Sequence, residues 1–223
     1  MTARQFAARL ARRARRAGVA VDEGLAAALW RYLDLLFRWN QRINLTGLSP
    51  DRPDEVIDRL VIEPLVAARQ LPRGAIVIDI GSGGGSPAVP LKLAAPDTRV
   101  TMVEAKARKC AFLREVVRQL QLEGMVVENA RYEELLPRAE LHEAFDVATV
   151  RAVRVERRLL LGLQAFVRPG GQVFLFRGAG ETEIPAAVTP PLRWSGSQPL
   201  GDSGRLVILE KQPIGSPSAG PSA

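Results

Sequence analysis

The sequence has almost none of the side chains on which much enzymatic chemistry depends. Its 223 residues include one cysteine, Cys110, and one histidine, His142. A disulfide framework or a zinc site of the cysteine and histidine type needs several such residues, so we expect neither, and we expect no metal site. A Ser-His-Asp triad would depend on His142 alone. This residue falls in a predicted surface loop, where we expect it to be solvated.

Long apolar runs and lysine are also scarce. No uninterrupted apolar run approaches the roughly 20 residues that a membrane span requires, so we expect no membrane contact. Four of the 31 basic residues are lysine, and the net charge is +7 with a pI near 10.4. Such an excess of positive charge favours a polyanionic partner, because neutralised phosphates release their counterions. The lone cysteine is compatible with a reducing compartment such as the cytoplasm.

The chain divides at about residue 72. Before this point, apolar residues recur at three- and four-residue spacing, which predicts a helical extension over residues 1–71. The expected helices cover residues 2–17, 22–40 and 54–71, and Asp22 is a candidate N-cap of the second.

Strands and helices are expected to alternate over residues 72–211, which predicts an α/β domain with a doubly wound, mostly parallel sheet. The expected strands cover residues 75–80, 99–103, 125–129, 145–150 and 172–177, and the expected helices cover 87–95, 107–122 and 155–167. Segments near residues 192–194 and 205–210 are candidates for an antiparallel pair at the sheet edge. Residues 212–223 have the composition of a disordered tail.

A glycine-rich loop follows the first expected strand. Asp79 ends this strand, and four glycines come directly after it: Gly81, Gly83, Gly84 and Gly85. Residues without a Cβ let the backbone turn sharply and approach a ligand closely. Pro87 suits the first turn of the next helix, and Ser86 is a candidate N-cap. The pattern predicts a site for a nucleotide-type cofactor.

The glycine spacing helps to separate two classes of ligand. A dinucleotide site needs a glycine at the sixth position of the loop, where this chain has Ser86. The order from Asp79 to Gly85 resembles motif I of the class I S-adenosylmethionine-dependent methyltransferases. Glu104 ends the next expected strand, where a carboxylate can accept hydrogen bonds from both ribose hydroxyls of either ligand. A dinucleotide-dependent oxidoreductase is the alternative from another enzyme class.

The first eighteen residues contain six arginines and no acid: Arg4, Arg9, Arg12, Arg13, Arg15 and Arg16. An organellar transit peptide would also be rich in serine, and this segment has none. A helix that contacts nucleic acid would direct these guanidinium groups at phosphates. A solvated helix face is the third interpretation and the most common role of such charge runs.

Several motifs occur in a characteristic order along the chain. They are WNQRINLT at 39–46, the proline-containing glycine loop, VEAKARKCAFL at 103–113, ARYEEL at 130–135, VRAV at 150–153 and LFRG at 175–178. Together they resemble the GidB-type family, also called methyltransferase G of the small ribosomal subunit, over about residues 25–211. The resemblance implies a class I, Rossmann-like methyltransferase fold and N7 methylation of a guanine in the 530 loop of 16S ribosomal RNA. It also implies S-adenosylmethionine as cofactor, 16S ribosomal RNA or a small-subunit precursor as partner, and a mostly monomeric bacterial enzyme of the cytoplasm.

The resemblance also assigns site residues. The donor would be bound by Asp79, Gly81, Gly83, Gly85, Ser86, Glu104, Tyr132, Glu133 and Arg151. The RNA would be contacted by Asn44, Arg59, Arg151 and Arg177. Tyr132 and Glu133 would lie beside the adenine, and Arg151 would reach the donor's carboxylate or the substrate. The alternative for Arg151 is an ion pair with Asp146 or Glu133 at the end of its strand.

Several positions depart from the family pattern. Leu60 replaces a histidine, Glu63 an aspartate, Ser86 a large apolar residue, Ala88 a glycine and Arg177 a lysine. These departures leave two alternatives open, namely methylation of another RNA site and a non-catalytic RNA-binding assembly protein with a degenerate cofactor fold. N7 of guanine carries a lone pair and no proton. The favoured reaction therefore needs no general base, alignment of the reactants can supply most of the catalysis, and no catalytic residue is assigned.

Overall fold

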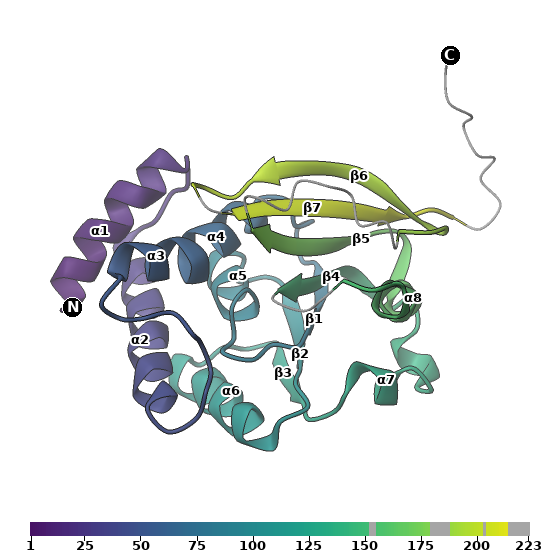
Figure 1. Ribbon diagram of the computed structural model, residues 1–223, viewed down its shortest axis with the longest axis horizontal. Helices are drawn as coiled ribbons and strands as arrows, with labels where there is room; N and C mark the ends of the chain where they lie inside the picture. The colour runs from purple at the N-terminus through teal and green to yellow at the C-terminus, as the bar shows by residue number, and fades with distance from the viewer. Residues whose placement is uncertain (152–154, 179–187, 203, 214–223) are drawn as a thin grey trace, which may run out of the picture.

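The computed structural model describes residues 1–151, 155–178, 188–202 and 204–213 (Figure 1). Of the predicted disordered tail, residues 212–223, the part from residue 214 onward lies outside the described residues. Ala152 and Val153 of the VRAV motif also lie outside them.

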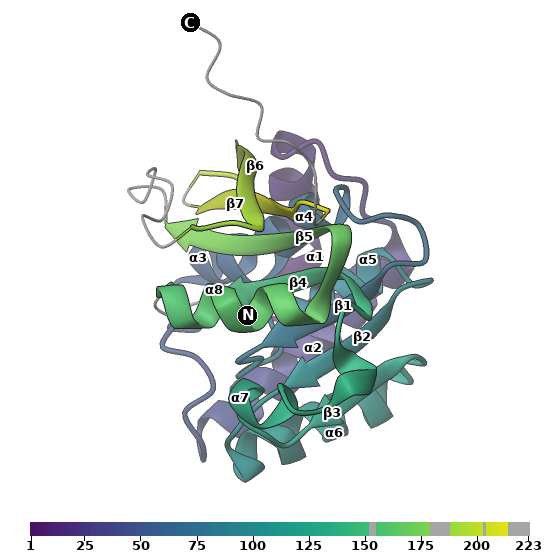
Figure 2. The same ribbon diagram turned by 90° about the vertical axis from the view of Figure 1, so that its right-hand side faces the viewer.

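A seven-stranded, mostly parallel sheet forms the centre of the molecule, with the strand order β3-β2-β1-β4-β5-β7-β6 (Figures 1 and 2). The strands are β1 (Ile76–Ile80), β2 (Arg99–Val103), β3 (Met125–Glu128), β4 (Phe145–Arg151), β5 (Val167–Gly178), β6 (Leu192–Pro199) and β7 (Gly204–Lys211). β7 runs antiparallel to β5 and β6. The predicted strands and the antiparallel pair at the edge are confirmed. β5 begins earlier than expected, because Val167 already pairs with Phe145 of β4.

Helices cover both faces of this sheet. One face carries α5 (Ala88–Ala94) and α6 (Ala107–Leu120), and the other carries α7 (Tyr132–Leu135), the 3-10 helix η2 (Ala139–Leu141) and α8 (Arg157–Phe166). Alternate residues of the strands supply two hydrophobic clusters, one for each face, as expected for a sheet buried on both sides. The sequence pattern did not indicate α7 and η2, because helices of a single turn are too short to show a period.

The N-terminal extension packs on the face that carries α5 and α6 (Figure 1). Its helices are α1 (Ala3–Arg16), α2 (Glu23–Asn40), α3 (Pro53–Ile57), the π-helical turn η1 (Asp58–Ile62) and α4 (Glu63–Ala68). The expected third helix over residues 54–71 is therefore interrupted by a wider turn. Asp22 caps α2 as predicted, since its side chain accepts a hydrogen bond from the backbone N–H of Leu25 at 2.7 Å.

A single hydrophobic cluster runs through the extension and the sheet domain. Phe6 and Leu10 of α1 are fully buried in it, together with Val77 of β1 and Phe112 of α6. The boundary predicted near residue 72 marks a change in secondary structure, and the core continues across it.

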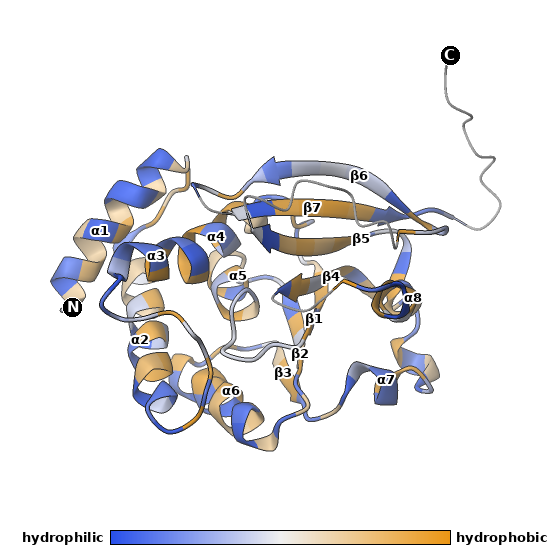
Figure 3. Ribbon diagram, viewed as in Figure 1, coloured by the Kyte–Doolittle hydropathy of each residue, from blue (hydrophilic) through white to orange (hydrophobic). Residues whose placement is uncertain are grey.

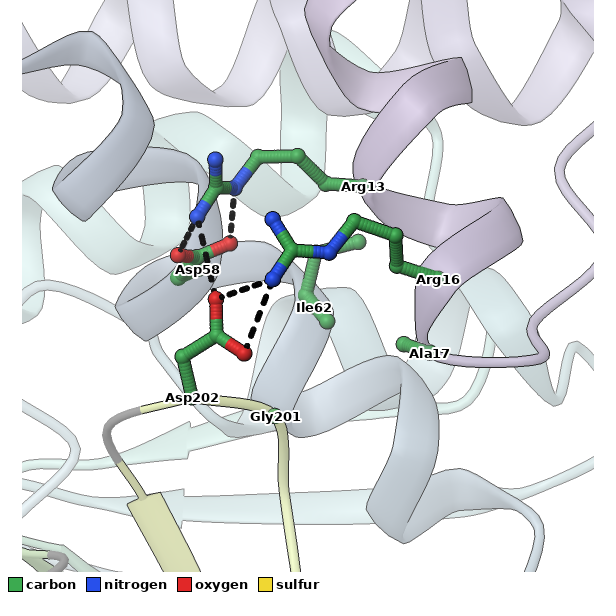
Figure 4. A pocket seen from close by; sticks show the side chains of 7 residues that line it. All are labelled: Arg13, Arg16, Ala17, Asp58, Ile62, Gly201 and Asp202. Atoms are coloured by element: carbon green, nitrogen blue, oxygen red, sulfur yellow. Dashed lines mark hydrogen bonds and ion pairs between the residues drawn. The ribbon is translucent and has the colours of Figure 1, made fainter.

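Ion pairs also attach α1 to the rest of the protein. Figure 4 shows Arg13 beside Asp58 of η1, and Arg16 beside Asp202 in the turn between β6 and β7. Arg9 forms a further ion pair with Asp54 of α3 at 2.7 Å. Three of the six N-terminal arginines therefore bind carboxylates of this protein, an arrangement that none of the three sequence-based interpretations included. The other three, Arg4, Arg12 and Arg15, are exposed.

The hydropathy of the strands follows their depth in the sheet (Figure 3). β5 and β7 are hydrophobic along most of their length, whereas the edge strand β6 is more hydrophilic. Polar edge strands hinder pairing with other chains. No helix in the described part of the chain is long and apolar enough to cross a membrane.

Removing the Phe6 ring should test how firmly α1 is docked. Phe6 is fully buried, so Phe6→Ala should lower the free energy of unfolding by about 3–5 kcal/mol, from lost burial and the cavity that is left. Urea denaturation measures this change. Arg4→Ala, at an exposed position of the same helix, should change the free energy by less than about 0.5 kcal/mol. Equal effects of the two variants would show that α1 is not docked in solution.

Candidate cofactor and substrate site

The glycine loop lies at the carboxyl ends of β1 and β2. Gly81, Gly83 and Gly85 have φ values of +75°, +51° and +86°, which residues with a side chain rarely adopt. The backbone N–H of Gly81 donates to the carbonyl of Val103 at 2.9 Å, so the first residue after β1 is bound to the end of the neighbouring strand β2. A Cβ on Gly85 would also lie 3.0 Å from the side chain of Val89. The backbone conformation thus explains why glycines occupy these positions.

Glu104 is directly attached to this loop. Its carboxylate accepts hydrogen bonds from the backbone N–H of Gly83 at 3.0 Å and of Lys106 at 2.8 Å. Each carboxylate oxygen has two lone pairs, so Glu104 retains acceptor capacity for hydroxyl groups of a ligand. The side chain of Asn129, just after β3, donates to the carbonyls of Glu104 and Ala105, both at 3.1 Å.

Asp79 lies beneath the loop and is almost completely buried. Thr149 of β4 donates to one of its carboxylate oxygens at 2.6 Å. The other oxygen, Oδ2, has no hydrogen-bond partner among the described residues. Burial raises the pKa of Asp79 above its usual value, and the hydrogen bond from Thr149 opposes this shift. A buried acceptor without a partner is costly in a folded protein, so this oxygen fits a ligand's donor group or a bridging water molecule.

A cavity of about 350 Å³ opens beside the glycine loop, within the range of roughly 300–1,000 Å³ for small-molecule sites. Three parts of the chain line it. The extension supplies Leu36, Leu45, Thr46, Gly47, Leu48, Arg59 and Leu60; the loop supplies Gly81, Ser82, Gly83, Gly84 and Ser86; the sheet domain adds Lys109 and Arg151. The extension and the cofactor loop therefore form one site.

Arg151, at the end of β4, is held firmly at the wall of this cavity. Its guanidinium forms an ion pair with Glu63 of α4 at 2.5 Å and lies 4.6 Å from the ring centroid of Phe176. It also donates to the hydroxyl of Ser86 at 3.3 Å and to the carbonyl of Arg59. The alternative that Arg151 pairs with Asp146 or Glu133 is wrong, because its ion-pair partner is Glu63.

Asp146 has other partners. Its carboxylate accepts hydrogen bonds from the backbone N–H of Ile76 at 2.7 Å and from Arg168 at 2.6 Å. These groups are near the amino end of β1, whereas Arg151 is at the carboxyl end of β4. The length of β4 separates the two residues.

Glu63 is 1% exposed and is shared by two arginines. Arg59 forms the second ion pair with it, at 3.0 Å. Burial raises the pKa of Glu63 although both arginines oppose the shift, and burial lowers the pKa of Arg151 to about 10. The carboxyl group also lies against Gly204, where any Cβ would collide with it. Glu63 therefore fits only because β7 begins with a glycine.

The π-helical turn η1 places two carbonyl groups in the site. The carbonyl of Arg59 accepts from Arg151, and the carbonyl of Leu60 accepts from the hydroxyl of Ser86 at 3.1 Å. The prediction that Ser86 caps α5 is wrong, because Pro87 occupies the cap position and no side chain bonds there. The Ser86 hydroxyl is used by Leu60 and Arg151 instead.

Several residues assigned from the resemblance are not among those that line this cavity, including Tyr132, Glu133, Asn44 and Arg177. Tyr132 and Glu133 are on α7, and the Tyr132 ring packs so closely on α8 that a Cβ at Gly162 would be 2.6 Å from it. Asn44 is exposed. Arg177 follows Phe176 on β5, so strand alternation directs it to the opposite face of the sheet from Phe176 and Arg151.

Other residues that shape the site were not predicted from the sequence. Asn40, at the end of α2, accepts hydrogen bonds from the backbone N–H of Leu45 at 2.8 Å and of Thr46 at 2.9 Å. Lys109 lines the cavity and Asn129 supports the end of β2. Asn40 and Asn129 are the last residues of a predicted helix and of a predicted strand, and polar residues at such ends are the signal that could have identified them.

The lone cysteine and histidine lie outside the cavity. The Cys110 thiol is buried and donates to the carbonyl of Glu104, and His142 is exposed, as expected for a solvated loop residue. In the described part of the chain, no three metal-binding side chains of the histidine, cysteine or acidic type come together.

A family model and individual related proteins point to the same family for this chain. Residues 25–188 match the family model described as GidB: rRNA small subunit methyltransferase G. The ribosomal RNA small subunit methyltransferase G of Syntrophotalea carbinolica is 31% identical, over 89% of this chain and 94% of that protein. The protein of the same name from Chloroflexus aggregans is 35% identical, over 92% of this chain and 90% of its own length.

Solved structures support the fold. A SAM dependent methyltransferase from Aquifex aeolicus superposes with a TM-score of 0.54 at 16% identity, over 72% of this chain and 93% of that one. A mutant of MtNAS in complex with S-adenosylmethionine has a TM-score of 0.58 at 18% identity, over 85% and 78% of the two chains. The class I, Rossmann-like methyltransferase fold is confirmed. With the family model matching most of its length, the chain belongs to the GidB family of rRNA small subunit methyltransferases G.

Proposed function

We propose that this protein methylates N7 of a guanine in the 530 loop of 16S ribosomal RNA, with S-adenosylmethionine as methyl donor. Family membership supports methyl transfer to ribosomal RNA, and donor use agrees with the names of the solved proteins that share the fold. N7 is the position that the family resemblance implies, and one observation in the cavity agrees with it. Among the described residues that line it, the ionisable side chains are Arg59, Lys109 and Arg151, and all three are basic.

A cavity without an acidic or histidine side chain among its described lining residues suits a nucleophile that has no proton to lose. Methylation of an exocyclic amine needs a group that removes a proton, whereas N7 attacks through its lone pair. When bound, S-adenosylmethionine supplies a methyl group on a sulfonium, which is a good leaving group. In the proposed transfer a carbon–nitrogen bond would form as the carbon–sulfur bond breaks, and the positive charge would pass from sulfur to the guanine. The protein's part is then to hold the two reactants in line.

The residues at the glycine loop fit this donor. Glu104 has acceptor capacity for the ribose hydroxyls, and the unpartnered oxygen of Asp79 lies below the loop. Tyr132 and Glu133 follow β3, at the same edge of the sheet, and remain our choice for the adenine side. The amino acid end of the donor would lie against the loop residues Gly81, Gly83, Gly85 and Ser86.

The arginines should bind anionic groups of the RNA and the donor rather than the guanine base. Methylated guanine is cationic, so a guanidinium that faced it directly would be repelled. Arg59 can meet an RNA phosphate at the cavity mouth, where its side chain is 29% exposed. Arg151 is largely buried and can reach the donor's carboxylate. Asn44 and Arg177 stay proposed contacts of the RNA outside the cavity.

One observation favours the alternative of a different RNA site. Leu60 and Ser86, two of the departures from the family pattern, both line the cavity. A change of lining can change which nucleotide fits. We also propose that the enzyme is a cytoplasmic monomer. Its substrate would be 16S ribosomal RNA or a small-subunit precursor, and a polyanionic substrate agrees with the net charge of +7.

Glu104→Gln should weaken donor binding while keeping the size of the side chain. A charge-assisted hydrogen bond contributes about 1.5–3 kcal/mol, so the affinity for S-adenosylhomocysteine should fall roughly tenfold to a hundredfold. Isothermal calorimetry measures this affinity. Glu123→Gln, an exposed carboxylate beyond α6, should bind like the unaltered protein. An unchanged affinity in the Glu104 variant would remove this residue from the donor site.

The exposed arginines of α1 should contribute to RNA binding without selecting sequence. Replacing Arg4, Arg12 and Arg15 by alanine should flatten the slope of log affinity against log salt by about 0.7–0.9 per lost phosphate contact. Arg73→Ala, at an exposed position outside α1, just before β1, is the control and should leave the slope unchanged. A triple variant with the original slope would show that this helix face is only solvated.

The product can be identified in ribosomal RNA from a strain that lacks this protein. That RNA should have lost one N7-methylguanine, and expression of the protein should restore it, as measured by nucleoside digestion and mass spectrometry. A deletion strain that keeps every N7-methylguanine but loses another methylated nucleoside would contradict N7 methylation and favour the alternative RNA site.

A further inference from the structure

The outer side of the glycine loop is in contact with the N-terminal extension. Tyr32 of α2 is fully buried, and its hydroxyl donates a hydrogen bond to the carbonyl of Gly84 at 2.6 Å. The ring of Tyr32 also lies against the next residue, since a Cβ at Gly85 would be 3.5 Å from it. Burial raises the pKa of Tyr32, which keeps the phenol protonated and able to donate.

Gly84 is held from a second side by the segment after α2. A Cβ at this position would lie 3.0 Å from the carbonyl oxygen of Leu45 and 3.1 Å from the side chain of Leu36. The position of Leu45 is in turn set by Asn40, which accepts its backbone N–H at 2.8 Å. The loop therefore has no room to move toward the extension, and one hydrogen bond holds it there.

We infer that Tyr32 is a positioning residue for the donor loop, and that the extension is a structural part of the donor site. Glu104, just after β2, binds the loop at Gly83. Tyr32 of α2 binds it at the adjacent Gly84. Two anchors on neighbouring residues define where the loop backbone lies before any ligand arrives. This inference rests on the proposed function only in naming the ligand, because both anchors are contacts within the protein itself.

Tyr32→Phe removes the anchoring hydroxyl and keeps the buried ring. The affinity for S-adenosylhomocysteine, measured by calorimetry well below the melting temperature, should fall about threefold to tenfold, as expected for a lost hydrogen bond of ordinary strength. Amide hydrogen exchange, measured without added donor, should also become faster at residues 81–86. This second measurement does not depend on donor binding.

Thr98→Val is a matched control. The Thr98 hydroxyl is also buried and donates to a backbone carbonyl, that of Ala95 at 2.7 Å, but it lies before β2 at the other end of the sheet. Thr98→Val should lower the free energy of unfolding by a similar amount. It should leave the donor affinity and the amide hydrogen exchange of the loop unchanged. Gly84→Ala is a second variant. Its Cβ would crowd the carbonyl of Leu45 and the side chain of Leu36, which should displace the loop and weaken donor binding in the same way.

The outcomes separate the inference from the proposed function. Faster exchange in the loop of Tyr32→Phe, but not of Thr98→Val, supports the positioning role. Equal exchange in the two variants would overturn it, and so would equal donor affinities. If the unaltered protein binds no S-adenosylhomocysteine, the proposed function fails, while hydrogen exchange still decides whether Tyr32 positions the loop.

Discussion

The buried ion pair between Glu63 and Arg151 is the constraint on which the site depends. Removing two charges from water is costly, and the cost is offset only when both groups are paired and hydrogen-bonded. Here the carboxylate is shared with Arg59, and the guanidinium bonds to Ser86 and to the π-helical turn. Four separate parts of the chain are thereby fixed relative to one another: α4, β4, the glycine loop and the start of β7.

The same pair explains several local irregularities. A regular α-helix uses its own carbonyl groups, whereas η1 directs those of Arg59 and Leu60 to side chains outside the helix. Wider turns of this kind often occur at functional sites. The glycine at the start of β7 leaves space for the carboxyl group of Glu63. Both the π-helical turn and the glycine at the start of β7 therefore accommodate the groups of this ion pair.

Local signals in the sequence were sufficient to predict most of the fold. Strands such as β1 are short, apolar and β-branched, and the glycine order after Asp79, together with Glu104 at the end of the next strand, indicated a cofactor loop. The motifs from WNQRINLT to LFRG indicated the family, which the comparisons confirm. These features depend on residues close together in the chain.

The contacts that define the site could not be predicted in this way. Arg151 and Glu63 are 88 positions apart, and Tyr32 and Gly84 are 52 apart. A buried carboxylate looks like any other in a sequence, so Asp146 and Glu133 were equally plausible partners. The π-helical turn was hidden because its apolar residues continue the helical pattern of α3. The ion pairs of Arg9, Arg13 and Arg16 were not predicted for the same reason, since Asp54, Asp58 and Asp202 are distant in sequence.

The hydrogen bond from Ser86 joins the glycine loop to the backbone carbonyl of Leu60 rather than to its side chain. A carbonyl group is present whatever residue occupies position 60, so this contact does not depend on leucine. A substitution at this position can therefore alter the side chain that lines the cavity and leave the attachment of the loop in place. The wall of the site can thus change shape without losing its link to the loop.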